Sequence, residues 1–373
     1  MRDNRATRGA AVCTVALGAA LATSLPTALA CIAIPARAEA PFSFAATPGK
    51  LPKDVIPLMY NAHLVPNIAD DTFSGSQTVE IEVLRQTRRI VLNAANLAIE
   101  HATLSGHGLA QRALDPILDE KQETLAFQLA SPLAPGRYTL ALRFRGQINR
   151  EGRGLFQVRY KANGVDKKLV ATTMQPSDAR RMLPTWDEPA FRARFRLTVD
   201  VPASFKAYSN TPVEKQEKLA GGLQRFSFAP TPNMPSYLVV LVAGEMERVS
   251  ARQSGVEIGI VTTEGKLGSA AFPLAATKDL LRYYNNYFGV PYPLAKLDQI
   301  AIPGGFNGAM ENWGGIVYNE STLLYDPKKS PEDTKKLSFE VNAHEVAHQW
   351  FGNLVTMAWW DNLWLNEGFA SWM

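Results

Sequence analysis

The chain has 373 residues, of which 46% are hydrophobic and 20% charged, and a formal net charge of +4. These values are ordinary for a globular protein and leave room for two domains with hydrophobic cores. No basic tract indicates nucleic-acid binding. Both cysteines, Cys13 and Cys31, lie near the N-terminus, so cysteine neither crosslinks the fold nor binds a metal.

Residues 1–40 have the layout of a secretory signal peptide. Three arginines precede an apolar stretch over residues 10–25, and small-residue cleavage sites follow at residues 28–30 and 36–38. We therefore expect an exported protein, periplasmic or secreted, without a membrane span after cleavage. An uncleaved anchor, or a lipoprotein attached at Cys31, is the alternative.

Residues 41–250 are dominated by alternating apolar and polar positions. Clear examples are residues 78–83, 138–143 and 194–199, and Gly, Pro and Asn separate such segments. A period of two indicates strands with one buried face. This part of the chain is expected to form a mostly antiparallel β domain.

Near residue 250 the pattern becomes mixed, so residues 251–373 are expected to form a second domain. A strand is predicted at 256–261, a helix near 270–287, and a further strand within the apolar stretch 297–303. The candidate metal ligands and the candidate general base lie within the last 44 residues.

A metal-ligand pattern lies within residues 344–367, which read HEVAHQWFGNLVTMAWWDNLWLNE. His344-Glu345-x-x-His348 is the H-E-x-x-H signature of zinc peptidases, and Glu367 follows after eighteen further residues. Residues i and i+4 lie on one face of a helix, so both histidines can reach one ion. Two imidazoles and one carboxylate are the ligand set of a catalytic zinc, one Zn²⁺ per chain, with an open position for water. Glu345, beside this face, is free to act as the general base.

The helix that carries these histidines has a predicted start and stop. Ser330 is expected as the N-cap, before Pro331 and two acids, and the apolar stripe is expected to run from Leu337 to Phe351. Gly352-Asn353 is the expected stop. Glu367 would lie roughly 28 Å along a continued helix, so the chain must turn back. Asp361 is the expected N-cap of a second helix that carries Glu367.

Three further segments allow a family to be recognised. Residues 308–314 read GAMENWG, residues 364–371 read WLNEGFAS, and residues 175–195 contain the D-E-P sequence. Segments 209–213 and 232–245 add to the likeness. Together with H-E-x-x-H-x18-E, these motifs resemble the aminopeptidase N family of zinc metallopeptidases over roughly residues 55–373.

The resemblance implies an α+β multidomain fold, in which the N-terminal β domain precedes a truncated, thermolysin-like α/β catalytic domain. It implies peptide substrates with a free N-terminus, whose ammonium group is bound by Glu311 of the G-A-M-E-N motif and by Gln175. The backbone of the motif would run alongside the substrate like an adjacent strand. The substrate-binding residues expected in this way are Gln175, Gly308, Ala309, Met310, Glu311 and Asn312.

The family also supplies an oxyanion-stabilising tyrosine from a position C-terminal of the third ligand, beyond Met373. The chain is therefore expected to be an N-terminal fragment with little or no peptidase activity alone. Two other functions remain open. A branch of the family hydrolyses epoxides, but its motif begins G-G, whereas this chain has Ala309. A non-catalytic relative would serve as a binding module, although such relatives typically lose a zinc ligand or the base.

Overall fold

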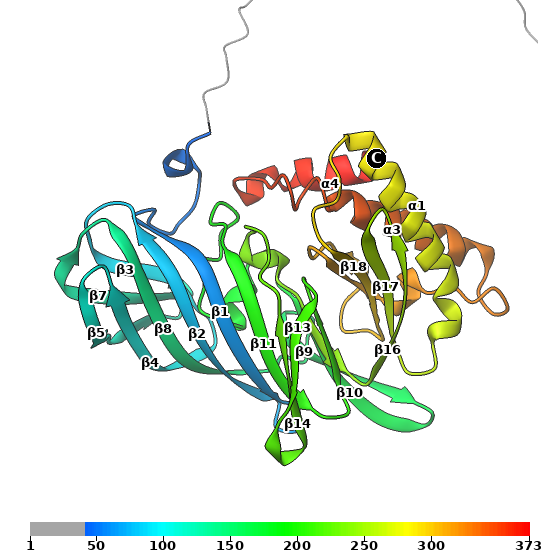
Figure 1. The fold of residues 1–373 in the computed structure, drawn as a ribbon, viewed down its shortest axis with the longest axis horizontal. Helices are drawn as coiled ribbons and strands as arrows, with labels where there is room; N and C mark the ends of the chain where they lie inside the picture. Colours follow the sequence, from blue (N-terminus) through cyan, green and yellow to red (C-terminus); the bar gives the residue numbers. More distant parts are fainter. Residues whose placement is uncertain (1–41) are drawn as a thin grey trace, which may run out of the picture. The chain divides into compact units, whose positions relative to one another are not determined.

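The computed structural model describes residues 42–373, and residues 43–373 form one compact unit (Figure 1). The predicted leader, residues 1–40, lies outside the described residues. None of the helices in residues 42–373 is both long and apolar enough to cross a membrane.

An eight-stranded sheet dominates the first part of the structure, with strand order β13-β14-β11-β1-β2-β8-β4-β5. All neighbours are antiparallel except β1 and β11, which are parallel. The strands are β1 (Val55–Asn67), β2 (Thr72–Val83), β4 (Leu97–Gly106), β5 (Leu109–Ala113), β8 (Gly136–Gln147), β11 (Arg194–Pro202), β13 (Val213–Lys218) and β14 (Leu223–Phe228). The predicted strands at 78–83, 138–143 and 194–199 are confirmed within β2, β8 and β11.

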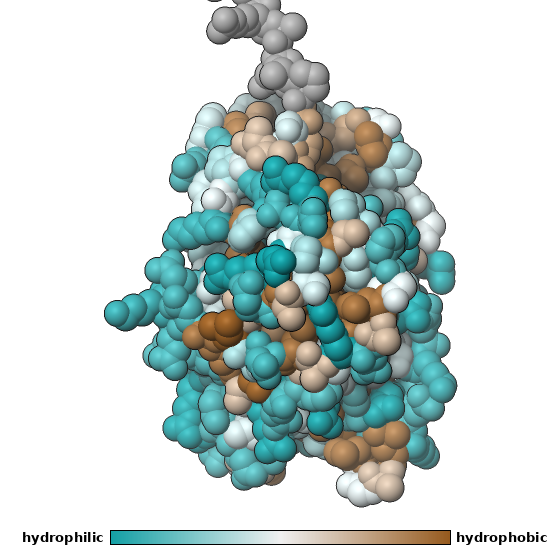
Figure 2. Space-filling view, turned by 90° about the vertical axis from the view of Figure 1, so that its left-hand side faces the viewer, coloured by the Kyte–Doolittle hydropathy of each residue, from teal (hydrophilic) through white to brown (hydrophobic). Residues whose placement is uncertain are grey.

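The alternating apolar and polar residues of the sequence lie on opposite faces of this sheet. In β2, Val79, Ile81 and Val83 are buried, while Thr78 and Glu80 face outward. Because side chains alternate along a strand, one face packs on the core and the other remains polar. Figure 2, which views the molecule from the end where β3, β4, β5 and β7 lie in Figure 1, shows a largely hydrophilic surface with apolar residues in small groups.

Two smaller antiparallel sheets complete this β domain. One contains β3 (Thr87–Asn93), β7 (Thr124–Leu133) and β6 (Pro116–Asp119). The other has the order β12-β15-β10-β9, from β9 (Gly154–Ala162), β10 (Val165–Thr173), β12 (Lys206–Ser209) and β15 (Leu241–Gly244). The prediction of a mostly antiparallel β domain is confirmed.

A mixed sheet with helices on one side forms the C-terminal unit, residues 246–373 (Figure 1). Its order is β16-β17-β18-β20-β19, and both pairs that involve β18 are parallel. The strands are β16 (Met246–Gln253), β17 (Val256–Thr263), β18 (Lys296–Ile302), β19 (Ala309–Met310) and β20 (Gly315–Asn319). The helices are α1 (Ala271–Phe288), α2 (Glu320–Leu323), α3 (Glu332–His348) and α4 (Leu363–Trp372).

The predicted strand and helix after residue 250 correspond to β17 and α1. Helix α1 connects the parallel strands β17 and β18, which need such a crossover. The division predicted near residue 250 falls inside β16 and stays a prediction.

The C-terminal unit packs against the β domain through a second hydrophobic cluster. Ile300 and Val317 of the mixed sheet meet Val240 and Val242, at β15, in this fully buried cluster. The loop between β18 and β20, which contains residues 308–314, also contacts the β domain, where Asn210 Nδ2 donates to the carbonyl of Trp313 at 2.9 Å.

Candidate metal centre

Helices α3 and α4 bring the three predicted metal ligands together. One ligand atom from each of His344, His348 and Glu367 lies within 4.8 Å of the other two. The two histidine Nε2 atoms are 2.9 Å apart. Glu367 Oε2 lies 3.2 Å from Nε2 of His344 and 3.4 Å from Nε2 of His348.

The start of α3 differs from the prediction. Pro331 occupies the N-cap position without a side-chain cap, and Ser330 Oγ accepts instead from Asp326 N–H at 3.2 Å. Ser330 is thus part of the preceding turn rather than the cap. The predicted apolar stripe is also wrong at its first position, because Leu337 is 43% exposed. The burial of α3 is concentrated near its C-terminal end, where the histidines lie.

The chain turns back between α3 and α4, as predicted, but α3 ends and α4 begins at residues other than those predicted. Helix α3 ends at His348, four residues before Gly352, and Phe351 bridges to Val355 across a tight turn. Asp361 lies inside a 3₁₀ turn, Trp360–Asn362, so its predicted capping role is wrong. Asn362 precedes α4, again without a side-chain cap. The 3₁₀ turn, rather than a cap, sets the direction of α4.

The hydrogen bonds of the histidines suit a cation at their centre. His348 Nδ1 lies 2.9 Å from the carbonyl oxygen of Phe351. A carbonyl can only accept, so Nδ1 carries a proton, and Nε2 is the ring nitrogen that faces His344 and Glu367. Ser371 Oγ lies 3.3 Å from Nδ1 of His344. The two Nε2 atoms, only 2.9 Å apart, lie close enough together to bind one metal ion.

Charge around the histidines points the same way. Burial would lower the pKa of His348, but the carboxylates of Glu311, Glu367 and Glu345 raise it to about 10. Hydrogen bonds from His344 and His348 lower the pKa of Glu367 to about 2. Several carboxylates therefore share one small buried region, which favours a positive charge there. Two imidazole nitrogens with one carboxylate oxygen fit zinc with an open coordination position.

Glu345 lies beside these ligands in the same helix. It is 5% exposed, and its Oε2 has no hydrogen-bond partner among the described residues. Burial raises the pKa of this carboxyl well above its usual value; His348 opposes the rise, and Glu311 and Glu367 add to it. A free, desolvated carboxylate oxygen is suited to proton transfer.

The loop 308–314 begins with a short edge strand. Ala309 and Met310 form β19, which pairs antiparallel with Tyr318 and Val317 of β20 and is the last strand of its sheet. Gly308 has φ +78°, a conformation that favours glycine, and its carbonyl accepts from Asn319 N–H at 2.9 Å. An edge strand can pair with an extended peptide. That Gly308, Ala309 and Met310 bind substrate stays a prediction.

Glu311 and Asn312 are both buried but face different neighbours. Asn366 Nδ2, next to the predicted ligand Glu367, donates to Glu311 Oε1 at 3.3 Å. The Glu311 carboxylate is thereby tied to α4. Asn312 Nδ2 donates instead to the carbonyl of Val239 in the β domain, at 3.4 Å. These contacts hold Asn312 in place, and its role toward substrate stays a prediction.

Gln175 is the remaining predicted site residue. It follows β10 in the β domain, and its buried Nε2 has no hydrogen-bond partner among residues 42–373. The structure gives it no hydrogen bond to the other predicted site residues. Its role in amine binding therefore stays a prediction.

Three buried amides around Glu311 were not identified from the sequence. Gln349 Nε2 and Asn353 Nδ2 donate to the carbonyl of Glu311, at 3.1 and 2.8 Å, and Asn366 Nδ2 to its carboxylate. All three lie between or next to predicted metal ligands in the sequence. Their proximity to these residues was the one feature of the sequence that could have identified them. Their shared partner, Glu311, lies 38 to 55 residues away in the chain.

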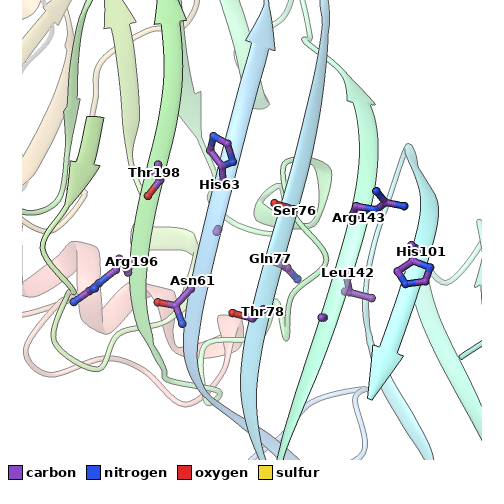
Figure 3. Close-up of a pocket in the computed structure, with 12 residues that line it drawn as sticks. Asn61, His63, Ser76, Gln77, Thr78, His101, Leu142, Arg143, Arg196 and Thr198 are labelled. Carbon is purple, nitrogen blue, oxygen red and sulfur yellow. The ribbon is translucent and has the colours of Figure 1, made fainter. Parts of the chain in front are cut away.

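A separate hollow of about 280 Å³ lies on the outer face of the eight-stranded sheet (Figure 3). His63 and His101 are among the residues that line it. Arg143 and Arg196 point away from each other in Figure 3, so the cationic side chains do not converge on one ligand position. No predicted site residue belongs to this hollow.

Comparison with known proteins gives consistent matches. The model of the Peptidase M1 N-terminal domain matches residues 56–238, and that of the Peptidase family M1 domain matches residues 272–373. An aminopeptidase N from Acetobacter pasteurianus is 41% identical over 344 residues, 92% of this chain and 96% of that protein.

Longer relatives match over the same region. Aminopeptidase M1-D from Oryza sativa subsp. japonica is 42% identical over 325 residues, and human endoplasmic reticulum aminopeptidase 1 is 38% identical over 330 residues. Each match covers 87% of this chain, but only 37% and 35% of those two proteins. The chain thus spans little more than a third of their length.

Proposed function

This chain belongs to peptidase family M1, and on that premise we propose that it acts as a zinc-dependent aminopeptidase, hydrolysing the N-terminal peptide bond of peptides. The observation that carries this proposal is the convergence of His344, His348 and Glu367 within 4.8 Å. The aminopeptidase names of the relatives, and the zinc dependence of M1 aminopeptidases, support it further.

We propose that His344, His348 and Glu367 bind one Zn²⁺. Zinc, when bound there, polarises the scissile carbonyl and lowers the pKa of a water molecule. Glu345 accepts the proton of the attacking water and delivers it to the leaving amine. Its Oε2 supports this role, because none of residues 42–373 forms a hydrogen bond to it and competes for the proton.

The restriction to N-terminal residues is proposed to come from Glu311. A buried carboxylate beside the proposed metal ligands can pair with the ammonium group of a free N-terminus, and the hydrogen bond from Asn366 holds this carboxylate in place. Gln175 is proposed as a second amine contact. The backbone of Gly308, Ala309 and Met310 is proposed to run beside the substrate, as expected for an edge strand.

The first experiment measures metal content and turnover in the full-length protein. We expect about one zinc per chain, lost in His344→Ala. Glu345→Gln should retain zinc but reduce turnover by about 10²–10⁴-fold, because only the base is removed. Loss of zinc in Glu345→Gln would show that base and ligand have been assigned wrongly.

Substrate comparison separates this proposal from its alternatives. Free-amine aminoacyl substrates should be cleaved and N-acetylated ones should not, and an epoxide substrate should remain intact. Zinc binding without any hydrolysis would instead favour a non-catalytic binding module. Efficient cleavage of N-blocked peptides would contradict the role of Glu311.

Export and domain division also belong to the proposal. We propose that residues 1–40 direct export and are removed, and that residues 41–250 and 251–373 are the two domains. N-terminal sequencing of the mature protein tests the first point. An unprocessed chain that stays in the cytoplasm would refute it.

A further inference from the structure

Gln349 directly follows helix α3, and its side chain is completely buried. Its amide uses all of its hydrogen-bonding groups on backbone atoms. Nε2 donates to the carbonyls of Glu311 at 3.1 Å and Glu345 at 3.2 Å. Oε1 accepts from Gly314 N–H at 3.2 Å. Among residues 42–373, Gln349 is the side chain that hydrogen bonds to the backbone of both glutamates.

The end of a helix makes this contact useful. The last carbonyls of an α-helix have no partner within the helix and need one from elsewhere. The carbonyl of Glu345 is in this position, and Gln349 supplies the donor. The same NH₂ group donates to the carbonyl of Glu311. A displacement of the loop that contains Glu311 would therefore pull the Gln349 amide away from the carbonyl of Glu345.

Neighbouring side chains hold the same loop from other directions. Asn353 Nδ2 gives the carbonyl of Glu311 a second donor at 2.8 Å. Asn210, from the β domain, donates to the carbonyl of Trp313 at 2.9 Å, and Lys296 Nζ donates to that of Gly314 at 2.7 Å. These contacts anchor the loop to the scaffold. Gln349 adds the link to the turn that carries Glu345.

We propose that Gln349 is a positioning residue that sets the spacing between Glu311 and Glu345. This inference rests on the proposed function, in which Glu311 binds the substrate ammonium and Glu345 serves as the base. The ammonium nitrogen and the scissile carbonyl carbon are separated by two covalent bonds. The two glutamates must therefore keep a fixed spacing, since a misplacement of about 1 Å can reduce a rate about 10²-fold.

The test variant is Gln349→Met in the full-length, zinc-loaded protein. Methionine retains the length and apolar stem of glutamine but forms none of the three hydrogen bonds. We expect KM for free-amine substrates to rise about tenfold and kcat/KM to fall about 10–100-fold, with zinc content unchanged. Backbone amides in residues 308–315 should exchange with deuterium at least about tenfold faster, since the loop loses a clamp.

Gln224→Met provides a matched control. Gln224 is also a buried glutamine whose Nε2 donates to backbone carbonyls, including that of Ala203 at 3.0 Å, but it lies in β14. The chemical change is identical and also lowers stability. Its kinetic constants and the exchange of residues 308–315 should remain those of the wild type. Equal kinetic losses in both variants would show that Gln349→Met acts only by lowering the stability of the protein, and would overturn the proposal.

A double-mutant cycle with Glu311→Ala makes the test specific. If Gln349 acts through Glu311, then Gln349→Met should reduce kcat/KM by less than about twofold once Glu311 is gone, because contacting residues are not additive. A full 10–100-fold loss in that background would overturn the proposal. Should Gln349→Met not fold, Gln349→Glu, which keeps the acceptor for Gly314, is expected to raise KM in the same way.

Failure of the proposed function would look different. A wild-type chain that does not distinguish free from N-acetylated amines would refute the assignment of Glu311. Deuterium exchange would then decide the positioning role by itself. Unchanged exchange of residues 308–315 in Gln349→Met overturns it.

Discussion

Two glycines near the proposed metal ligands differ in whether the structure requires glycine there. Gly352, in the turn after α3, has φ +128°, and a Cβ there would lie 2.4 Å from Asn366 Oδ1 and 3.1 Å from His348 Nδ1. Gly368 lies exposed in α4, one residue after Glu367, and a Cβ there would meet nothing within 4 Å. Backbone conformation and space therefore require glycine at the first position only.

We predict opposite effects for alanine at these two positions. Gly352→Ala should lower the free energy of unfolding by about 1–3 kcal/mol and reduce zinc content, because it displaces His348 and Asn366. Gly368→Ala should raise the free energy of unfolding by about 0.5–1 kcal/mol, since alanine favours the helix. Urea unfolding and metal analysis measure both effects. Wild-type stability in Gly352→Ala would contradict the steric argument.

At the level of elements, an ionic cluster joins three adjacent strands of the large sheet. Asp200 of β11 accepts from Nε and Nη2 of Arg225 in β14, each at 2.7 Å. His63 Nε2 of β1 lies 3.0 Å from Asp200 Oδ2. The cluster thus spans the parallel pair β1–β11, whose slanted hydrogen bonds are slightly weaker than antiparallel ones. Burial would raise the pKa of Asp200, but Arg225 and His63 hold it below its usual value.

This lowered pKa predicts a pH-dependent contribution to stability. A carboxyl with a lowered folded-state pKa stabilises the protein above its unfolded pKa of about 3.9, and the contribution disappears as the pH falls through the folded value. Asp200→Asn should therefore cost about 1–3 kcal/mol at pH 7. In urea unfolding, the difference from wild type should shrink below about pH 4.

An exposed carboxylate serves as the control for Asp200. Asp166 pairs with Lys161 at 2.8 Å, but its side chain is 84% exposed. Solvent screens such a pair, so Asp166→Asn should stay within about 0.5 kcal/mol of wild type at both pH values. A difference for Asp200→Asn that persists unchanged at pH 3 would refute the assignment.

At the scale of the whole molecule, the β domain and the C-terminal unit share buried structure. The main core cluster runs from Leu51 to Ala370, and a second cluster lies between the four- and five-stranded sheets. Asn210 adds a polar link, since its amide bonds to Leu238 O, Trp313 O and Val240 N. Neither part can separate without exposing apolar surface and unpaired buried polar groups.

We therefore predict a single cooperative unfolding transition for residues 43–373. Calorimetry, near-ultraviolet and far-ultraviolet circular dichroism should report the same midpoint. Asn210→Ala, which leaves three buried backbone groups without their partner, should shift this whole transition downward. Two resolved transitions, or a shift confined to one probe, would show that the two parts unfold independently.

Local patterns in the sequence were sufficient for several features of this protein. The period-2 segments predicted strands that the structure contains, because alternation depends only on which face of a strand is buried. The i, i+4 spacing of His344 and His348 predicted their convergence for a similar reason, since helix geometry alone determines it. The motifs around Glu311 and Glu367 were sufficient to recognise the family.

Contacts between distant residues were decided only by the tertiary structure. Ser330 and Asp361 are residue types that commonly cap helices. Ser330 instead accepts a hydrogen bond within the preceding turn, and Asp361 lies in a 3₁₀ turn. Gln349 and Asn366 were passed over, because an amide has no fixed partner until the chain brings one to it. The parallel pairing of β1 with β11 likewise depends on segments more than a hundred residues apart. Periodicity and spacing act along the chain, whereas caps, clamps and strand order depend on what packing places beside each residue.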